Sequence, residues 1–330
     1  KKKKINALGR VIRELEREEG ESGNTVVMTL DLELQRYANQ RLSRQESASA
    51  VVMDIHNGEV LAMASHPAYD PNAFTTGISH RLWNSLVNNP YSPLSNKAVN
   101  GPYAPGSTFK MCVALAGLES GIISADQRFF CNGHLDLGNA RFHCWKRGGH
   151  GWVNMHNSLK HSCDVYYYEI SQKIGIDRIA AMAKKLGLGT ETGIDLPNER
   201  SGLIPTKDWK EIQLGKRWQG GETLIASIGQ GYVLTTPLQL CTMTARIASG
   251  KAVKPHLTRD HVAPDGISSR QNEEFPDLQI SRASLARVRD GMNGVSNELH
   301  GTGYRARIDI KGMELAGKSG TSQVRRITMP

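Results

Sequence analysis

The sequence lacks a run of about 20 consecutive apolar residues, the length that a helix needs to span a bilayer. A charged segment followed by an apolar one, which would mark a secretion signal, is also missing from its start. As given, the chain is therefore expected to be soluble. The opening run from Lys1 to Lys4 looks like a cut end, so we expect that an upstream anchor or export signal has been left out.

Internal repeats and low-complexity tracts are absent too, because the 33 glycines are scattered among turn-like positions without a period. This excludes solenoid and fibrous architectures. The chain has 330 residues, of which 39% are hydrophobic and 22% charged, the balance of a globular protein that can bury a core. Its length allows one large domain or two ordinary ones.

No helix-turn-helix, zinc-finger or aromatic-plus-basic RNA-binding pattern accompanies the net charge of +9. Positive charge attracts polyanions, whether nucleic acid, anionic lipid or acidic wall polymer, and does not choose among them. Beyond the first four lysines, the basic residues are dispersed among acidic ones. We therefore predict no nucleic-acid partner.

Local patterns divide the chain into a charged start and a folded body. Residues 1–23 are highly charged without a clear apolar stripe, and they are interpreted as a linker or the remnant of a preceding domain. The body then spans residues 24–330. It opens with a predicted strand over 25–30 and a helix over 31–41 that Asp31 caps.

A hairpin is predicted at the centre of the sheet. Strands over 50–55 and 59–64 are joined through Asn57-Gly58, a dipeptide typical of a tight two-residue turn. Both arms are apolar on nearly every residue, so both faces should be covered. This implies a central antiparallel sheet flanked by helices.

Three later segments complete the fold class. Residues 107–118 are apolar almost all round and predict a buried helix. Thr236, Pro237 and Gly250 mark the N-cap, first turn and end of another helix. Residues 315–324 predict a strand interrupted by glycine. The fold is therefore predicted to be α+β, with a helical subdomain inserted between strands of the sheet.

The first candidate for chemistry is a serine followed three residues later by a lysine. Ser107 falls at the start of the predicted buried helix, and Lys110 shares its face. The helix N-terminus offers unpaired N–H groups to a developing negative charge, and a neutral lysine can accept a proton. Alone, the same pattern also fits an N-cap serine beside a solvated lysine.

Two later motifs favour the catalytic interpretation. Lys318-Ser319-Gly320-Thr321 carries a cation and two hydroxyls on the predicted strand, where the missing side chain of glycine leaves room for an extended ligand. Ser162-Cys163-Asp164 places another hydroxyl beside a polar partner. This trio of motifs is typical of penicillin-binding proteins and class A β-lactamases.

Over roughly residues 24–330 the chain resembles the transpeptidase domain of class B penicillin-binding proteins, of the rod-elongation group. The resemblance implies the penicillin-binding and serine β-lactamase-like transpeptidase fold, with residues 1–23 as a remnant of an N-terminal pedestal domain. Besides the three motifs, it rests on Tyr69-Asp70-Pro71-Asn72, Gly149-His150-Gly151, Gly175-Ile176-Asp177-Arg178, Thr192-Gly193-Ile194-Asp195-Leu196, Gly229-Gln230-Gly231-Tyr232 and Thr236-Pro237.

The resemblance implies a serine D-Ala-D-Ala transpeptidase that needs no cofactor for catalysis. Ser107 would attack the D-Ala-D-Ala carbonyl of a peptidoglycan stem, and Lys110 would take its proton. The N–H groups of Ser107 and Thr321 would form the oxyanion hole, and Ser162 would relay a proton to the leaving D-alanine. The residues implied to bind the substrate carboxylate are Lys318, Ser319, Gly320 and Thr321. Lys318 and Asp164 are also implied to be catalytic, and the positive charge of Lys318 would help keep Lys110 neutral.

The implied setting is the periplasmic face of the bacterial inner membrane, with an N-terminal anchoring helix outside this chain. A membrane glycosyltransferase of the elongation machinery is the implied partner, and β-lactams would acylate Ser107 and leave slowly. The sequence departs from the family twice. Asp164 stands where most of the superfamily has asparagine, and the chain ends at Pro330, before the family's last central strand and packed C-terminal helix.

A Cys3His metal site is a further possibility, spaced Cys131-x12-Cys144-x5-His150-x12-Cys163. Structural zinc there would fix the backbone of the Ser162 motif. The alternatives are a Cys131–Cys144 disulfide and buried free thiols. His134 and His143 are possible substitute ligands, whereas Cys112 and Cys241 lie in apolar stretches and are predicted core residues.

Rival functions remain at the sequence level. A D-Ala-D-Ala carboxypeptidase differs only in using water as the acceptor. A β-lactamase needs an acidic group that activates water, and no loop motif clearly supplies one. A penicillin-sensing domain would hold a long-lived adduct without transfer. A pseudoenzyme scaffold is disfavoured because Ser107, Lys110, Ser162 and Lys318 are all intact.

Overall fold

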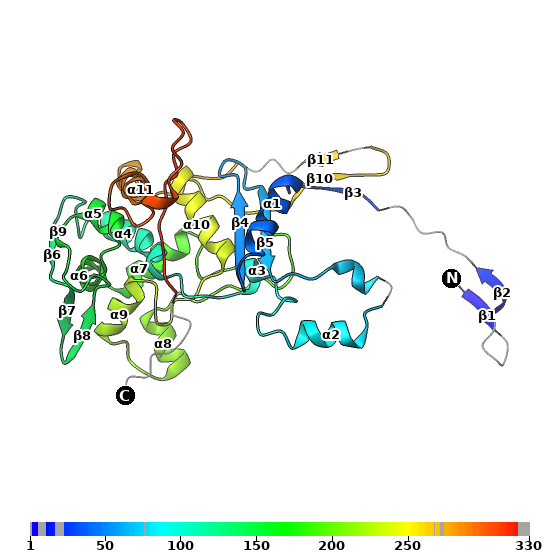
Figure 1. Ribbon diagram of the computed structural model, residues 1–330, viewed down its shortest axis with the longest axis horizontal. Helices are drawn as coiled ribbons and strands as arrows, with labels where there is room; N and C mark the ends of the chain where they lie inside the picture. The colour runs from blue at the N-terminus through cyan, green and yellow to red at the C-terminus, as the bar shows by residue number, and fades with distance from the viewer. Residues whose placement is uncertain are drawn as a thin grey trace. The chain divides into compact units, whose positions relative to one another are not determined.

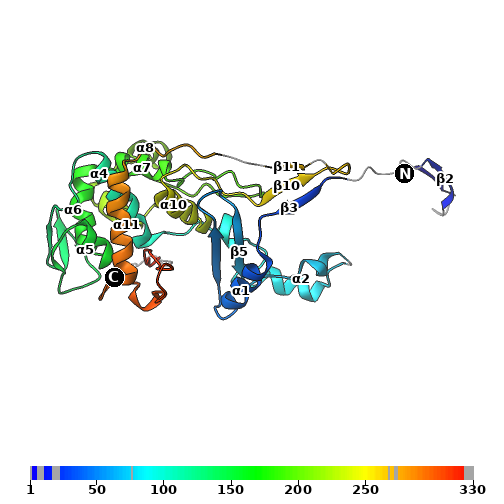
Figure 2. The same cartoon turned by 90° about the horizontal axis from the view of Figure 1, so that it is seen from above.

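The computed structural model describes residues 2–5, 11–16, 23–75, 77–266, 268–270 and 274–322 (Figures 1 and 2). The chain divides into two compact units, Lys1–Met28 with Thr258–Asn272, and Thr29–Leu257 with Glu273–Pro330. The predicted boundary between residues 1–23 and 24–330 stays a prediction. Within the described residues, no helix is both long and apolar enough to cross a membrane.

The smaller unit contains two antiparallel sheets. Strands β1 (Lys2–Ile5) and β2 (Val11–Glu16) form one pair. The other sheet has the order β11 (Ser268–Arg270), β10 (Thr258–Val262) and β3 (Thr25–Met28). The predicted strand over 25–30 is thus found over its first four residues.

The larger unit contains the predicted helix and hairpin. Helix α1 (Leu32–Leu42) begins at Asp31, whose side chain accepts a hydrogen bond from Leu34 N at 2.9 Å. Strands β4 (Ala48–Met53) and β5 (Val60–His66) then pair antiparallel around a turn in which Gly58 has φ of +78°. A positive φ is a conformation that glycine adopts without steric cost, which explains Gly58 in this turn. The hairpin is confirmed, but residues 54–59 join its strands, so the turn is longer than the predicted two residues, with Gly58 N donating to Asp54 O at 3.0 Å.

Helices cover this hairpin, as predicted. Helices α1, α3 (Lys97–Asn100) and α10 (Pro237–Ser249) contact its strands. Helix α10 has the predicted N-cap, with Thr236 Oγ1 accepting from Gln239 N at 3.2 Å, and it ends at Gly250 with φ of +77°. In the described residues the hairpin is a sheet of two strands.

The predicted strand over 315–324 is wrong for its described part. Residues 315–322 adopt no regular secondary structure and pair with no strand of the described chain. A strand needs a hydrogen-bonded neighbour, and here Gly317 N donates instead to Met292 O, inside the helix Arg282–Asn297, at 3.1 Å. Residues 323 and 324 lie outside the described residues.

The helical body surrounds one buried helix (Figure 1). Helix α4 (Lys110–Glu119) follows the short 3₁₀ turn η2 (Gly106–Phe109), and its residues from Lys110 to Gly117 are all buried. The predicted buried helix is therefore confirmed. The helices that contact α4 are α5 (Met155–Lys160), α6 (Asp164–Ile174), α7 (Ile176–Lys185) and α11 (Arg282–Asn297).

Small elements complete the larger unit. Two short sheets, β6 (Phe129–Cys131) with β9 (Gly151–Val153) and β7 (His134–Leu137) with β8 (Ala140–His143), precede α5 and contact α6. The remaining helices are η1 (Pro71–Phe74), α2 (His80–Val87), α8 (Lys207–Leu214), α9 (Gly220–Ser227) and η3 (Tyr304–Ala306).

Candidate active site

Ser107 lies in the 3₁₀ turn that leads into the buried helix α4. The preceding Gly106 has φ of +58°, and a Cβ there would lie 2.3 Å from Thr321 O. Gly106 N also donates to Gly229 O at 2.9 Å. Only glycine allows this approach, so the turn that carries Ser107 is packed directly against the backbone of Thr321. The first N–H groups of the helix have no intrahelical acceptor there.

Lys110 is fully buried and is held by three oxygens. Its Nζ lies 2.7 Å from Asp164 Oδ1, 2.9 Å from Ser162 O and 3.3 Å from Ser162 Oγ. The ammonium also lies 5.4 Å from the centre of the Tyr167 ring. Among the described residues it makes no hydrogen bond to Ser107 Oγ. Lys110 therefore joins the first motif to the second, and its predicted role as base for Ser107 stays a prediction.

Asp164 is the first residue of α6 and accepts two hydrogen bonds, one on each carboxylate oxygen. Its Oδ1 faces the Lys110 ammonium, and its Oδ2 accepts from Trp145 N at 2.8 Å. An ionised carboxylate accepts on both oxygens, whereas an asparagine would present an NH2 group to one of these donors. The departure from asparagine thus has a structural reason in this chain.

Ser162 immediately precedes this helix in a strained conformation. Its φ of +54° lies in the left-handed region, which a serine rarely adopts. Ser162 N donates to Leu159 O at 3.2 Å and Cys163 N to Ser158 O at 2.9 Å, so α5 holds the turn. The strain turns the Ser162 carbonyl and hydroxyl toward Lys110.

The segment Lys318–Thr321 is held mainly by side chains. Lys318 Nζ donates to Ser319 O at 3.0 Å, and Ser319 Oγ donates to Thr302 Oγ1 at 2.8 Å. Gln230 Nε2 donates to Thr321 O at 2.8 Å. Burial, followed by repulsion from Lys110, lowers the pKa of Lys318 to about 7, while Asp164 opposes that shift.

A cavity of about 590 Å³ brings the predicted groups together. Ser107, Ser162 and Asp164 line it with Ser319, Gly320 and Thr321, while the two motif lysines lie outside its lining. Two further lining residues, Cys144 and His143, were assigned from the sequence only to the metal site. The lining residues that received no role from the sequence are Trp145, Arg147, Ile225, Ile228, Gln230 and Thr302. Gln230 belongs to the Gly229–Tyr232 motif, which supports the resemblance but gives this residue no role. Thr302 lies between two glycines, a pattern that only weakly indicates a functional residue.

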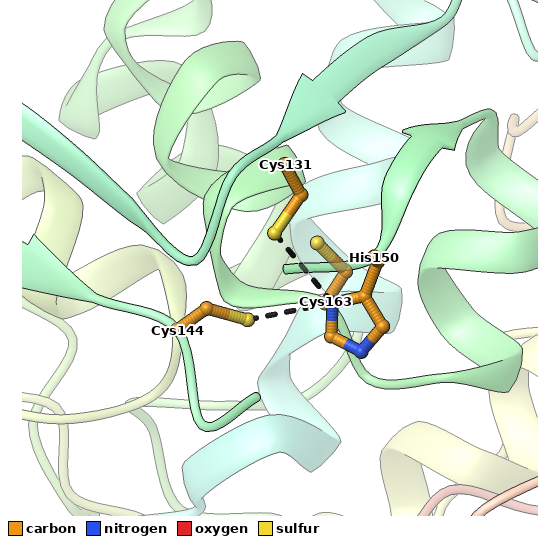
Figure 3. Close-up of side chains that lie close together, drawn as sticks. All are labelled: Cys131, Cys144, His150 and Cys163. Carbon is orange, nitrogen blue, oxygen red and sulfur yellow. Dashed lines mark hydrogen bonds between the residues drawn. The ribbon is translucent and has the colours of Figure 1, made fainter. Parts of the chain in front are cut away.

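The predicted metal ligands form a second cluster (Figure 3). One ligand atom from each of Cys131, Cys144, His150 and Cys163 lies within 4.8 Å of the others. His150 Nδ1 lies 3.6 Å from Cys131 Sγ and 3.5 Å from Cys144 Sγ. His134 and His143 are not part of this group.

All the cysteines are free thiols in the structure, so the alternative Cys131–Cys144 disulfide is not found. Cys112 is fully buried, as predicted for a core residue, and Cys241 is half-buried. The donor set of three sulfurs and one imidazole fits a tetrahedral zinc site.

Hydrogen bonds within the cluster shift the pKa values of these thiols. A bond from Cys163, then one from His150, lowers the pKa of Cys144 to about 2 and that of Cys131 to about 6. The same bonds to Cys131 and Cys144 raise the pKa of Cys163. Cys131 and Cys144 therefore favour the thiolate, the form that binds metal, whereas Cys163 favours the thiol.

Comparison with known proteins gives consistent matches. Residues 48–326 match the family model described as penicillin binding protein transpeptidase domain. The peptidoglycan D,D-transpeptidase MrdA of Escherichia coli K12 is 39% identical over 325 residues, which cover 97% of this chain and 51% of that protein. The chain thus spans about half the length of the curated relatives it matches.

Two solved structures share the fold. Penicillin-binding protein 2 of Pseudomonas aeruginosa, in complex with WCK 5153, has a TM-score of 0.83 at 37% identity, covering 92% of this chain and 69% of that one. Penicillin-binding protein 2 of Helicobacter pylori, in complex with MreC, has a TM-score of 0.84 at 34% identity, covering 98% of this chain and 59% of that one.

Proposed function

Because the chain belongs to the family of penicillin-binding protein transpeptidase domains, we propose that it is a serine D,D-transpeptidase that cross-links peptidoglycan stem peptides. Similarity to penicillin-binding protein 2 confirms the predicted resemblance. The observation that carries the proposal is the single cavity that joins Ser107 to Ser162 and to the Ser319–Thr321 segment, above a fully buried Lys110.

Acylation begins at Ser107 Oγ, which attacks the carbonyl of the penultimate D-alanine. Lys110 in its neutral form accepts the hydroxyl proton, and the same proton passes to the nitrogen of the last D-alanine as the C–N bond breaks. Lys110 Nζ lies 3.3 Å from Ser162 Oγ, which supports Ser162 as the hydroxyl that passes the proton on. The product is an acyl-enzyme, which the amine of a second stem resolves.

Two N–H donors would stabilise the negative charge that develops on the oxygen of the tetrahedral intermediate. The 3₁₀ turn before α4 supplies the N–H of Ser107, and the close contact between Gly106 and Thr321 O supports Thr321 N as the other. A Cβ on Gly320 would lie 2.9 Å from Pro105 O, so the segment approaches this turn at a second point. Donors fixed before the reaction need no reorganisation during it.

Lys318, Ser319 and Thr321 bind the terminal carboxylate of the stem. The Lys318 side chain is half-buried and its pKa is about 7, so a carboxylate beside it would stabilise the charged form. β-Lactams carry a comparable anionic group and should acylate Ser107. A carboxypeptidase, which uses water in place of the amine, is the alternative that the same residues allow.

Structural zinc at Cys131, Cys144, His150 and Cys163 is the second part of the proposal. When bound, zinc would cross-link four backbone positions through its ligands. Two of them adjoin the catalytic groups, because Cys163 lies between Ser162 and Asp164, and Asp164 N donates to Cys144 Sγ at 3.4 Å. Metal analysis of the purified protein tests this. Stoichiometric zinc is expected, with loss on Cys144→Ser, and a metal-free folded wild type would refute it.

The proposed setting is the periplasmic face of the inner membrane, with an anchoring helix outside this chain. A membrane glycosyltransferase of the elongation machinery is the proposed partner, supported by similarity to MrdA and to penicillin-binding protein 2. The Helicobacter pylori relative was solved with MreC, and a similar partner is proposed for this protein.

The test of the catalytic proposal is the intact mass after incubation with a penicillin. We expect one persistent adduct, mapped to the peptide that contains Ser107 and lost in Ser107→Ala. A folded wild type without adduct would refute the assignment. An adduct that disappears within seconds would point to a β-lactamase.

A further inference from the structure

Two side chains from distant parts of the chain hold the Ser319–Thr321 segment. The residues of this segment are exposed, and Gly317, just before it, donates a backbone hydrogen bond to Met292 O at 3.1 Å. The side chains of Gln230 and Thr302 contact the segment itself.

Gln230 is the first support. Its side chain is almost buried, and Nε2 donates to Thr321 O at 2.8 Å. Gly229 beside it contacts the nucleophile turn, because a Cβ there would lie 2.2 Å from Gly106 O. One loop therefore touches both the turn that carries Ser107 and the residue that carries the second oxyanion donor.

Thr302 is the second support and contacts Ser319, two residues before Thr321. Its Oγ1 lies 2.8 Å from Ser319 Oγ. The backbone that presents it is fixed, since Thr302 N donates to Lys160 O at 3.1 Å and Gly303 N to Val295 O at 2.9 Å. An ion pair between Lys160 and Glu298 links the same loop to α5.

The hydrogen bond between the Ser319 and Thr302 hydroxyls can form in either direction, so it can persist when a substrate binds. In the free protein Ser319 donates to Thr302. When Ser319 donates to a substrate carboxylate, Thr302 can rotate its own hydroxyl and donate to Ser319 Oγ, because each hydroxyl both donates and accepts. Such a chain strengthens the bond to the charged group.

We infer that Gln230 and Thr302 are positioning residues that hold the oxyanion donor at Thr321 and the carboxylate-binding hydroxyl at Ser319. The inference rests on the proposed function. Gln230 acts on the rate of acylation, because a donor that moves by about 1 Å can cost about 100-fold. Thr302 acts on binding of the anionic ligand, because loss of one hydrogen bond costs up to about 10-fold.

The test is penicillin acylation resolved into the dissociation constant of the initial complex and the first-order acylation rate. Gln230→Leu is expected to lower the rate about 100-fold with little change in the dissociation constant. Thr302→Val is expected to raise the dissociation constant about 10-fold, and Thr302→Ser to restore it.

Matched controls separate positioning from general damage. Gln35→Leu removes another glutamine that bonds a backbone carbonyl, that of Met63 at 3.0 Å, away from the cavity. Thr244→Val removes an exposed threonine hydroxyl on α10. Both should leave the two acylation constants at their wild-type values.

Hydrogen exchange of the peptide 316–322 in the free protein keeps the inference independent of the proposed function. Gln230→Leu should speed exchange there and leave other peptides unchanged. If the wild type fails to acylate but Gln230→Leu still speeds exchange in this peptide, the proposed function is wrong, whereas the positioning role of Gln230 is retained. The inference would be overturned by any of three results. Gln230→Leu and Thr302→Val could both acylate with wild-type constants, Gln230→Leu could leave the exchange rate of peptide 316–322 unchanged, or Thr302→Ser could fail to restore the dissociation constant.

Discussion

Asp164→Asn is the substitution whose cost the structure specifies best. The carboxylate accepts from Lys110 Nζ at 2.7 Å and from Trp145 N at 2.8 Å, and it is only 7% exposed. An amide keeps one acceptor oxygen. If that oxygen stays with Lys110, the NH2 group faces the Trp145 N–H, and one buried donor is left unpaired.

The magnitude follows from two contributions. An unpaired buried donor costs about 1–3 kcal/mol. Loss of the carboxylate charge beside the fully buried Lys110 adds to this, since breaking a buried ion pair costs about 3–5 kcal/mol when one partner is removed. Lys110 keeps its bonds to Ser162, so both contributions should lie at the low end of their ranges, and we expect a total loss of about 4 kcal/mol in the free energy of unfolding.

Urea denaturation of wild type and variant measures this free energy. Asp136→Asn is the matched control, because that carboxylate pairs with Arg141 on the exposed β7–β8 hairpin and should contribute far less. A double-mutant cycle with Lys110→Met should show a coupling of about 2–3 kcal/mol. If Asp164→Asn unfolds at the same urea concentration as wild type, the two-donor explanation is wrong.

The other predictions concern pH, packing and metal. Lys318 is charged below its pKa of about 7 and neutral above it, so the second-order rate of penicillin acylation should fall as pH rises through about 7, and Lys318→Ala should lack this limb of the pH profile. Gly106→Ala should abolish acylation and destabilise the fold, because its Cβ would lie 2.3 Å from Thr321 O. Gly121→Ala, with a similar φ of +66° but nothing within 4 Å, should acylate normally, and equal defects in both variants would contradict the contact argument. Removal of zinc with a chelator should lower both the melting temperature and the acylation rate, while Cys144→Ser should be insensitive to the chelator; a wild type that the chelator leaves unchanged would count against the metal.

Elements specified by neighbouring residues were predicted well from sequence. Asp31 caps α1, Asn57-Gly58 closes the hairpin, and Thr236 with Gly250 bounds α10, because caps and tight turns depend on a few adjacent residues. The buried helix after Ser107 followed from its apolar composition.

Features set by distant partners were not predicted. The segment 315–322 lacks a paired strand in the described chain, which no local pattern reveals. Trp145 N reaches Asp164, and Gln230 reaches Thr321 across 91 positions of sequence, so their roles depend on tertiary packing. The cysteine cluster was predictable because sulfur and imidazole ligands are few enough to be grouped by type.

Transfer of the acyl group is the most direct test of the account. The protein would be incubated with a stem pentapeptide that ends in D-Ala-D-Ala and with a second stem that carries a free amine, and both D-alanine and the cross-linked product would be quantified. The account predicts one D-alanine released for each cross-link or hydrolysed stem, with cross-links formed, and neither product from Ser107→Ala. Release that persists in Ser107→Ala, or a folded wild type that acylates with penicillin but never forms a cross-link, would contradict the assignment of a Ser107 transpeptidase.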